Sequence, residues 1–218
     1  MTLALFDAFE NEGEVRQEKL ASHAFVLRNF ALAQASHLLA AIEVVQLQAS
    51  FRHLVTPGGL QMSVAMTNCG TLGWVSDRRG YRYAESDPQS GQAWPAMPAV
   101  FLDLAKRAAA EVGFSDFTPE ACLINRYQVG SRLSLHQDKD EENYAAPIVS
   151  VSLGVPAMFL FGGLQRSDKT ARVPLFHGDV VVWGGPDRLR YHGILPLKQA
   201  QHAMTGEYRF NITFRKAG

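Results

Sequence analysis

The sequence predicts a mainly β protein of the α+β class, with a jelly-roll or barrel core and two flanking helices. Three observations support this fold class. After residue 120 the chain contains about eight short strand-like stretches separated by turn residues, a pattern typical of jelly rolls and barrels. Before that point, two segments show the apolar spacing of helices. Between them, residues 52–97 are rich in Gly, Pro, Ser and aromatic residues, which is typical of a functional lid.

The composition is that of one globular domain. The chain has 218 residues, of which 47% are hydrophobic, enough to bury a sizeable core. No repeat or linker divides it, so we expect a single domain over residues 1–218. Lys+Arg and Asp+Glu both number 21, which argues against wholesale coating by nucleic acid but allows a local basic groove.

The sequence also predicts a cytoplasmic protein without a membrane span. The apolar start of the chain lacks the basic flank of a signal peptide. The uncharged stretch 143–165 is interrupted by Gly154 and Pro156, so it predicts two buried strands and a turn. Cys69 and Cys122 are expected to be reduced, structural thiols.

The N-terminal part is expected to supply a tail, one strand and two helices. Residues 1–22 are assigned to the tail and "HAFVLR", 23–28, to the strand. Residues 29–48 are rich in Ala and Leu and contain no Gly or Pro, which predicts a helix. The second helix is expected from Pro98, a favoured first-turn residue, to Val112, with Gly113 ending it. Both helices are expected to cover one face of a sheet.

The jelly-roll core is assigned to residues 120–216. Its expected strands are "CLINRYQV", "RLSLHQD", "PIVSVSLG", "AMFLFGG", "RVPLFHG", "DVVVWGG", "RYHGI" and "YRFNITFR". Short strands at this spacing favour antiparallel sheets over a parallel βαβ arrangement.

The stretch "LSLHQDKDE", 133–141, places His136, Asp138 and Asp140 at every second position. Residues two apart on a strand share a face, so these groups predict either a solvated face or the floor of a site. His192 in "RYHGI" is the best candidate for a third metal ligand, and His177 and His202 compete with it. Two histidines and one carboxylate form the facial triad of non-haem Fe(II) oxygenases.

The stretch "YRFNITFR", 208–215, alternates apolar residues with polar ones. Its polar face carries Arg209, Asn211 and Arg215, and guanidinium groups pair bidentately with carboxylates. A diacid cosubstrate has two carboxylates to offer. Asn125 and Tyr127, two apart in "CLINRYQV", add further polar groups on one face of another strand.

The chain resembles the AlkB family of Fe(II)/2-oxoglutarate-dependent DNA dealkylases over roughly residues 27–218. The resemblance is carried by "VTPGG", "MSVAMTNCG", "LGW", "WPAMP", "CLINRY", "LSLHQDKDE", "APIVSVSLG", "FGGL", "HGDVVVWGG" and "YRFNITFR". It implies a double-stranded β-helix core, Fe(II), 2-oxoglutarate and O2. It assigns iron to His136, Asp138 and His192. It assigns 2-oxoglutarate to Asn125, Tyr127, Arg209, Asn211 and Arg215, with Arg209 at the distal carboxylate and Arg215 nearer the metal.

The resemblance also implies a substrate, which is single-stranded DNA, or RNA, carrying alkylated bases such as N1-methyladenine and N3-methylcytosine. The N-methyl group would be hydroxylated and released as formaldehyde, with succinate and CO2 as coproducts. Residues 52–97 would be a nucleotide-recognition lid. Trp74 would stack on the flipped base opposite His136, and Asp140 would contact its exocyclic amine. Tyr81, Tyr83 and Arg166 are further substrate-binding candidates, and Thr56, Arg82, Arg132 and Lys139 are weaker ones.

Three alternatives stay open from the residues alone. They are an oxygenase acting on a protein or small molecule, a non-catalytic jelly-roll binding module and a zinc hydrolase with the same three ligands. The lid aromatics, with arginines nearby, and Asp140 argue against the first. The arginines of "YRFNITFR" have no role in the other two. No obligate protein partner is evident.

Overall fold

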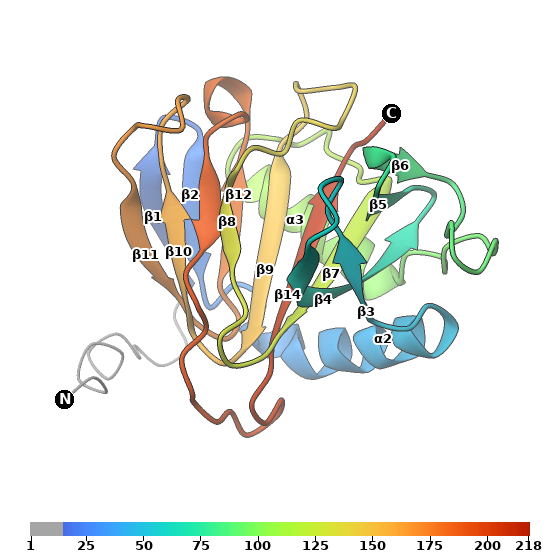
Figure 1. The fold of residues 1–218 in the computed structure, drawn as a ribbon. Coiled ribbons are helices and arrows are strands. Elements are labelled where there is room, and N and C mark those ends of the chain that lie inside the picture. The colour runs from blue at the N-terminus through green and yellow to red at the C-terminus, as the bar shows by residue number, and fades with distance from the viewer. Residues whose placement is uncertain (1–14) are drawn as a thin grey trace.

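Two facing antiparallel sheets and a separate two-stranded sheet make up the β structure of residues 15–218, the part of the chain that the computed structural model describes (Figure 1). Within this range the major sheet has the order β1-β2-β12-β9-β14-β7-β4-β3, and the minor sheet has the order β11-β10-β13-β8. The major-sheet strands are β1 (Arg16–Ala21), β2 (Ala24–Arg28), β3 (Arg52–Val55), β4 (Gln61–Gly70), β7 (Ala121–Tyr127), β9 (Ile148–Gly154), β12 (Val180–Trp183) and β14 (Arg209–Arg215). The minor-sheet strands are β8 (Leu133–His136), β10 (Ala157–Phe161), β11 (Ala171–Leu175) and β13 (His192–Ile194).

The predicted jelly-roll core is confirmed. The strands from β7 to β14 divide equally between the two sheets, as β12-β9-β14-β7 and β11-β10-β13-β8. Each of the eight stretches predicted after residue 120 overlaps one of these strands. The two sheets enclose a shared core that includes Tyr127, Phe159, Val181, Trp183 and Ile194. Polar side chains on the same inner faces therefore stand in largely dehydrated surroundings.

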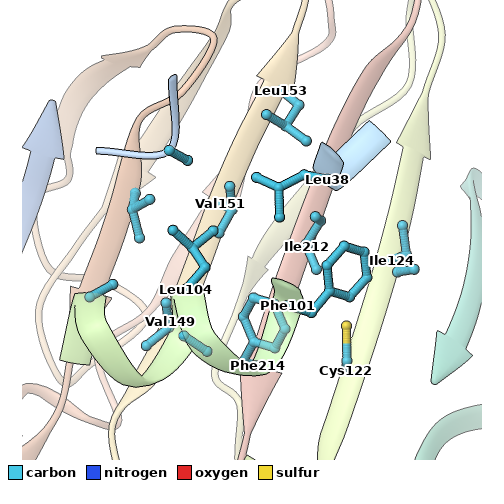
Figure 2. Close-up of a cluster of buried hydrophobic side chains, with 14 of the residues drawn as sticks. Leu38, Phe101, Leu104, Cys122, Ile124, Val149, Val151, Leu153, Ile212 and Phe214 are labelled. Carbon is cyan, nitrogen blue, oxygen red and sulfur yellow. The ribbon is translucent and has the colours of Figure 1, made fainter. Parts of the chain in front are cut away.

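The helices α2 (Ala35–Gln48) and α3 (Ala99–Glu111) cover the opposite face of the major sheet, as predicted (Figure 1). Figure 2 shows Leu38 of α2 and Phe101 and Leu104 of α3 over β9, β14 and β7. These three side chains are fully buried, and burial of each contributes about 1.5–3 kcal/mol. Among the described residues, neither helix is long and apolar enough to cross a membrane.

The first helix begins later than the sequence predicts. Asn29 adopts a left-handed conformation with φ of 59°, and its N–H donates to Asp179 Oδ1 at 3.1 Å. A short 3-10 helix, η1 (Leu32–Gln34), follows before α2 starts at Ala35. The turn that carries the chain from β2 to the helix layer therefore uses residues that the Ala/Leu-rich composition assigned to the helix. The second helix matches its prediction, since Pro98 lies directly before Ala99 and Gly113, with φ of 93°, follows the helix.

Two further segments differ from the sequence analysis. The assigned tail, 1–22, contains strand β1, and its first fourteen residues lie outside the described range. β1 is an outer strand with mostly exposed charged and polar side chains, so it lacks the apolar alternation that reveals a strand. The segment 52–97 also divides in two. Its strands β3 and β4 join the major sheet, whereas β5 (Gly73–Asp77) and β6 (Gly80–Ala84) form a hairpin of their own.

Candidate active site

The minor sheet and the loop that follows β8 bring together one potential metal centre. His136 ends β8, His192 begins β13, and the two residues are register partners in the minor sheet. Asp138 follows β8 by two residues, and its Oδ1 lies 3.6 Å from His136 Nε2 and 3.8 Å from His192 Nε2. The three ligand atoms lie within 4.8 Å of one another. In the described part of the chain this is the one group of three such residues placed to hold a metal ion.

Both imidazoles are held in the tautomer that suits metal binding. The Nδ1 atom of His136 lies 2.8 Å from the carbonyl oxygen of Ser134, and that of His192 lies 3.0 Å from the carbonyl oxygen of Arg190. A carbonyl accepts, so each Nδ1 carries the proton and each Nε2 is left with a free lone pair. Burial, aided by His136, lowers the pKa of His192 to about 4, which keeps it neutral at physiological pH.

Asp138 is fixed as a carboxylate by its surroundings. Although burial disfavours the charged form, Arg215 and the two histidines hold the pKa of Asp138 well below its usual value. Arg215 Nε donates to Asp138 Oδ2 at 2.8 Å, which leaves Oδ1 facing the histidines. The Arg188 guanidinium donates to the backbone oxygen of Asp138 at 2.7 Å. One carboxylate oxygen is thus committed to the protein and the other is available to a metal.

Strand alternation does not explain the positions of Asp138 and Asp140. β8 ends at His136, so the residues after it are not part of a strand and their faces are set by contacts instead. The arginine contacts place Asp138, while Asp140 Oδ2 accepts a hydrogen bond from Trp74 Nε1 at 2.8 Å. The strand alternation predicted for Asp138 and Asp140 is therefore wrong, because the strand ends at His136.

The competing histidines lie together, outside the triad. The rings of His177 and His202 are 4.3 Å apart between centroids, and the Gly154 N–H donates to His177 Nδ1 at 2.9 Å. Neither belongs to the metal-capable group formed by His136, Asp138 and His192. Of the three histidines considered, His192 is therefore the one placed to be the third ligand.

Beside the triad, β7 and β14 present a buried polar face with unused hydrogen-bonding groups. Arg209 is 1% exposed, and its guanidinium lies 4.8 Å from the Tyr127 ring centroid and donates to Ser152 Oγ at 3.0 Å. Its Nε and Nη1, the Tyr127 hydroxyl and Asn125 Oδ1 have no hydrogen-bond partner among the described residues. Asn211 is register partner to Asn125 and bonds to it at 3.2 Å. A buried guanidinium without an anion is costly, so this face suits a carboxylate ligand.

Three of the predicted substrate-binding residues, Trp74, Tyr81 and Tyr83, lie on the β5–β6 hairpin. Trp74 and Tyr81 stack with ring centroids 5.6 Å apart and planes 13° apart. The Tyr83 hydroxyl donates to Glu141 Oε1 at 2.7 Å. Arg166 lies apart from the hairpin in sequence; it is exposed, and its guanidinium lies 5.8 Å from the Tyr191 ring centroid. The hairpin therefore contacts the loop that carries Asp138, Asp140 and Glu141 at two points.

Two further residues of this region, Glu141 and Arg188, are not among the predicted site residues. Both are buried, with Arg188 Nη2 at 3.0 Å from Glu141 Oε2. Glu141 ends the stretch "LSLHQDKDE" and looks like one more surface charge, while Arg188 lies in a loop far along the chain. Only the fold brings them together, so the sequence held no pattern to reveal them.

Comparisons with known proteins agree with this geometry. The family model described as the 2OG-Fe(II) oxygenase superfamily matches residues 23–215. The alpha-ketoglutarate-dependent dioxygenase AlkB of Salmonella typhimurium is 58% identical over 98% of both chains. The human nucleic acid dioxygenase ALKBH1 is 35% identical over 56% of this chain and 31% of its own. The solved structure of OsALKBH1 superposes with a TM-score of 0.79 at 28% identity, covering 92% of this chain and 100% of that one.

The family match spans nearly all the described residues, and the facial triad and the buried polar face lie inside it. The family's cofactors are Fe(II), 2-oxoglutarate and O2, and the donor set found here suits them. The chain belongs to the AlkB family of 2OG-Fe(II) oxygenases and is an Fe(II)/2-oxoglutarate-dependent dioxygenase.

Proposed function

We propose that this dioxygenase removes N-methyl groups from bases such as N1-methyladenine and N3-methylcytosine in single-stranded DNA, and in RNA. The observation that carries the proposal is the aromatic hairpin beside the triad, where the Trp74 indole bonds to Asp140, two residues beyond Asp138. A planar aromatic surface and a carboxylate are what a flipped, positively charged methylated base requires. The human relative named a nucleic acid dioxygenase points to the same class of substrate.

In this proposal His136, Asp138 and His192 hold Fe(II) through two Nε2 atoms and Oδ1. Asn125, Tyr127, Arg209, Asn211 and Arg215 hold 2-oxoglutarate. When bound, this pair supplies the oxidation of a C–H bond by O2, with 2-oxoglutarate converted to succinate and CO2. Arg209, which lacks an anionic partner among the described residues, would bind the distal carboxylate, and Arg215, which contacts Asp138, would lie nearer the metal.

The hairpin residues would bind and orient the base. Trp74 would stack on it with His136 on its other side, and Asp140 would accept a hydrogen bond from its exocyclic amine. Tyr81, Tyr83 and Arg166 would contact the nucleotide or the strand. Extruding a base costs a few kcal/mol, and stacking on an aromatic side chain returns roughly 1–3 kcal/mol. A methyl group on the pairing edge lowers the cost of extrusion, so single strands and damaged bases would be favoured.

The proposal places the enzyme in the cytoplasm, and the free, buried state of Cys69 and Cys122 is consistent with a reducing compartment. It needs no obligate protein partner, because all three metal ligands come from this chain.

The test is a turnover assay with Fe(II), 2-oxoglutarate and a short single-stranded oligonucleotide carrying one N1-methyladenine. We expect formaldehyde and succinate in equal amounts, with little formaldehyde from the matched unmethylated strand. The same assay with an N3-methylcytosine oligonucleotide, and with the RNA equivalents of both, defines the range of substrates. Turnover of a peptide or free amino acid, with none on any methylated strand, would overturn the proposed substrate.

A further inference from the structure

The buried carboxylate of Glu141 lies between the β5–β6 hairpin and the metal-ligand carboxylate. Its Oε1 accepts a hydrogen bond from the Tyr83 hydroxyl at 2.7 Å and lies 3.3 Å from Arg215 Nε. The same Arg215 Nε donates to Asp138 Oδ2 at 2.8 Å. One continuous line of polar contacts therefore runs from the hairpin, through Glu141 and Arg215, to Asp138.

This line is electrically balanced. Glu141 Oε2 lies 3.0 Å from Arg188 Nη2, and the four charged side chains are two carboxylates and two guanidinium groups. All four side chains are at most 9% exposed. Buried charges are retained only when each is paired, and removing one member leaves an uncompensated charge in its place. Loss of the Glu141 charge would leave excess positive charge beside the metal ligands.

Other hydrogen bonds also hold the hairpin in place, but they connect it to parts of the protein other than the metal-ligand loop. The Asn68 side chain bonds to the backbone N–H and C=O of Trp74, both at 3.0 Å, and Trp94 Nε1 donates to the Ala84 carbonyl at 2.9 Å. These contacts tie the base of the hairpin to β4 and to the following loop. The Trp74–Asp140 contact reaches the metal-ligand loop but is made by groups with exposed surface. The Tyr83–Glu141 contact is better shielded, because Tyr83 is half-buried and Glu141 is buried.

We propose that Glu141 is a positioning residue that joins the hairpin to Asp138, so that loading of the metal and cosubstrate site orders the hairpin. The inference rests on the proposed function, in which the hairpin holds the nucleotide and Asp138 holds the metal. Tyr83 transmits the contact to the hairpin, and Arg215 transmits it to the metal ligand. Glu141 itself touches neither the base nor the reacting atoms.

The first test measures amide hydrogen exchange in the hairpin, residues 73–84, without any nucleic acid. Wild-type protein is compared with and without Mn(II) and 2-oxoglutarate under nitrogen, so that no reaction occurs. We expect loading to slow hairpin exchange by about tenfold, because a hydrogen bond to a charged group has that order of effect. In Tyr83→Phe, which loses only the hydroxyl, loading should leave hairpin exchange unchanged.

The second test distinguishes the effect of Glu141 on the metal ligand Asp138 from its effect on the hairpin. Glu141→Gln keeps an acceptor for Tyr83 but removes the charge, so we expect Mn(II) affinity to fall by about tenfold or more, the usual effect of losing a group that supports a metal ligand. Tyr83→Phe should leave Mn(II) affinity unchanged. Tyr144→Phe is the matched control. Its hydroxyl donates to the Lys139 carbonyl of the same loop at 2.8 Å but does not reach Glu141, so both readouts should stay as in wild type.

The inference is overturned if loading slows hairpin exchange equally in wild type and Tyr83→Phe, or if Glu141→Gln binds Mn(II) as tightly as wild type. Neither readout involves a methylated strand. Absence of formaldehyde release by a wild-type protein that shows the exchange effect would therefore refute the substrate and support the coupling. Formaldehyde release by a wild-type protein that shows no exchange effect would support the proposed substrate and refute the coupling.

Discussion

Each metal-ligand residue is held by a second group that decides which of its atoms is free. Backbone carbonyls of Ser134 and Arg190 fix the two imidazoles, and Arg215 occupies one oxygen of Asp138. Such supporting contacts orient ligands and commonly change metal affinity by 10–100-fold when lost. The protein's own contacts therefore determine which atom of each ligand faces the triad.

Replacing His192 by alanine should abolish Fe(II)-dependent turnover, because only two ligands remain. We expect Mn(II) binding to be lost in parallel, measured by titration of the purified variant. His177→Ala and His202→Ala are the controls, and both should keep the metal. Retention of metal by His192→Ala with loss in either control would show that a different histidine is the third ligand.

We expect Asp140 to contribute to turnover of the methylated base and not to metal affinity. In Asp140→Asn we expect kcat/KM for N1-methyladenine to fall by about tenfold or more, the effect of weakening one hydrogen bond to a charged group. Metal affinity should stay unchanged, since the Asp140 carboxylate is not in the triad. Glu142→Gln, an exposed carboxylate on the same loop, should change neither quantity. Loss of metal from Asp140→Asn would make Asp140 a ligand.

The His177–His202 contact predicts a pH effect on stability. Burial and the neighbouring His202 lower the pKa of His177 from 6.5 to about 4, and its Nδ1 accepts the Gly154 N–H only when unprotonated. The unfolded chain therefore takes up the proton first as pH falls. The stabilisation is complete above pH 6.5 and is lost progressively between about pH 6.5 and about pH 4.

We expect the wild-type melting temperature to fall over that pH window more steeply than that of His177→Asn, whose Oδ1 keeps an acceptor for Gly154 but does not titrate. The contribution of His192 is common to both proteins and cancels in the comparison. Equal pH dependence of the two melting temperatures would show that His177 makes no such contribution.

At the scale of elements, the alternation of β14 gives one strand two functions. Phe210, Ile212 and Phe214 pack under the helices, while Arg209 and Asn211 face the space between the sheets. Sequence alone could predict this strand, because its apolar and polar residues alternate with a clear period of two. It could also predict α3, whose apolar spacing is regular.

Other elements could not be predicted, for identifiable reasons. β1 is an outer strand with no apolar face, and the turn at Asn29 depends on Asp179, about 150 residues away. The loop after β8 is shaped by contacts with Arg188 and Arg215. The alternation of a strand therefore does not predict where its side chains point. The sequence revealed the residue types of the triad through their spacing and resemblance, but not the long-range ion pairs that place Asp138 and Glu141.

The helix layer should contribute strongly to stability through few side chains. Leu104 of α3 is fully buried over the major sheet, so Leu104→Ala should lower the free energy of unfolding by about 2–5 kcal/mol. Leu47, near the end of α2, is 84% exposed, and Leu47→Ala should change the free energy of unfolding by no more than about 0.5 kcal/mol. Denaturant titration of both variants measures the difference. Similar values for the two would mean that the helices do not pack as described.

At the scale of the whole molecule, charge balance limits how nucleic acid can be held. The formal net charge is zero, and Arg79 and Arg82 of the hairpin both pair with Asp77. Binding should therefore depend on a small number of phosphate contacts and on stacking of the extruded base.

The affinity for a single-stranded oligonucleotide should fall only moderately with salt. With about three phosphate contacts, the slope of log affinity against log salt concentration should be about −2. Fluorescence anisotropy from low to high salt measures it, and Arg166→Ala should make the slope less negative by about 0.7 if that side chain contacts a phosphate. A wild-type slope steeper than about −5 would require an extended basic surface, contrary to this expectation.

The complete burial of β14 has a consequence for how the protein can change over generations. All seven residues from Arg209 to Arg215 are buried, whereas most of β1 is exposed or half-buried. Every position of β14 is committed either to the packed helix layer or to the polar face toward the other sheet. In a saturation library, β1 should accept most substitutions and β14 almost none. Variation among descendants of this sequence should therefore accumulate at the outer strand and spare the central one.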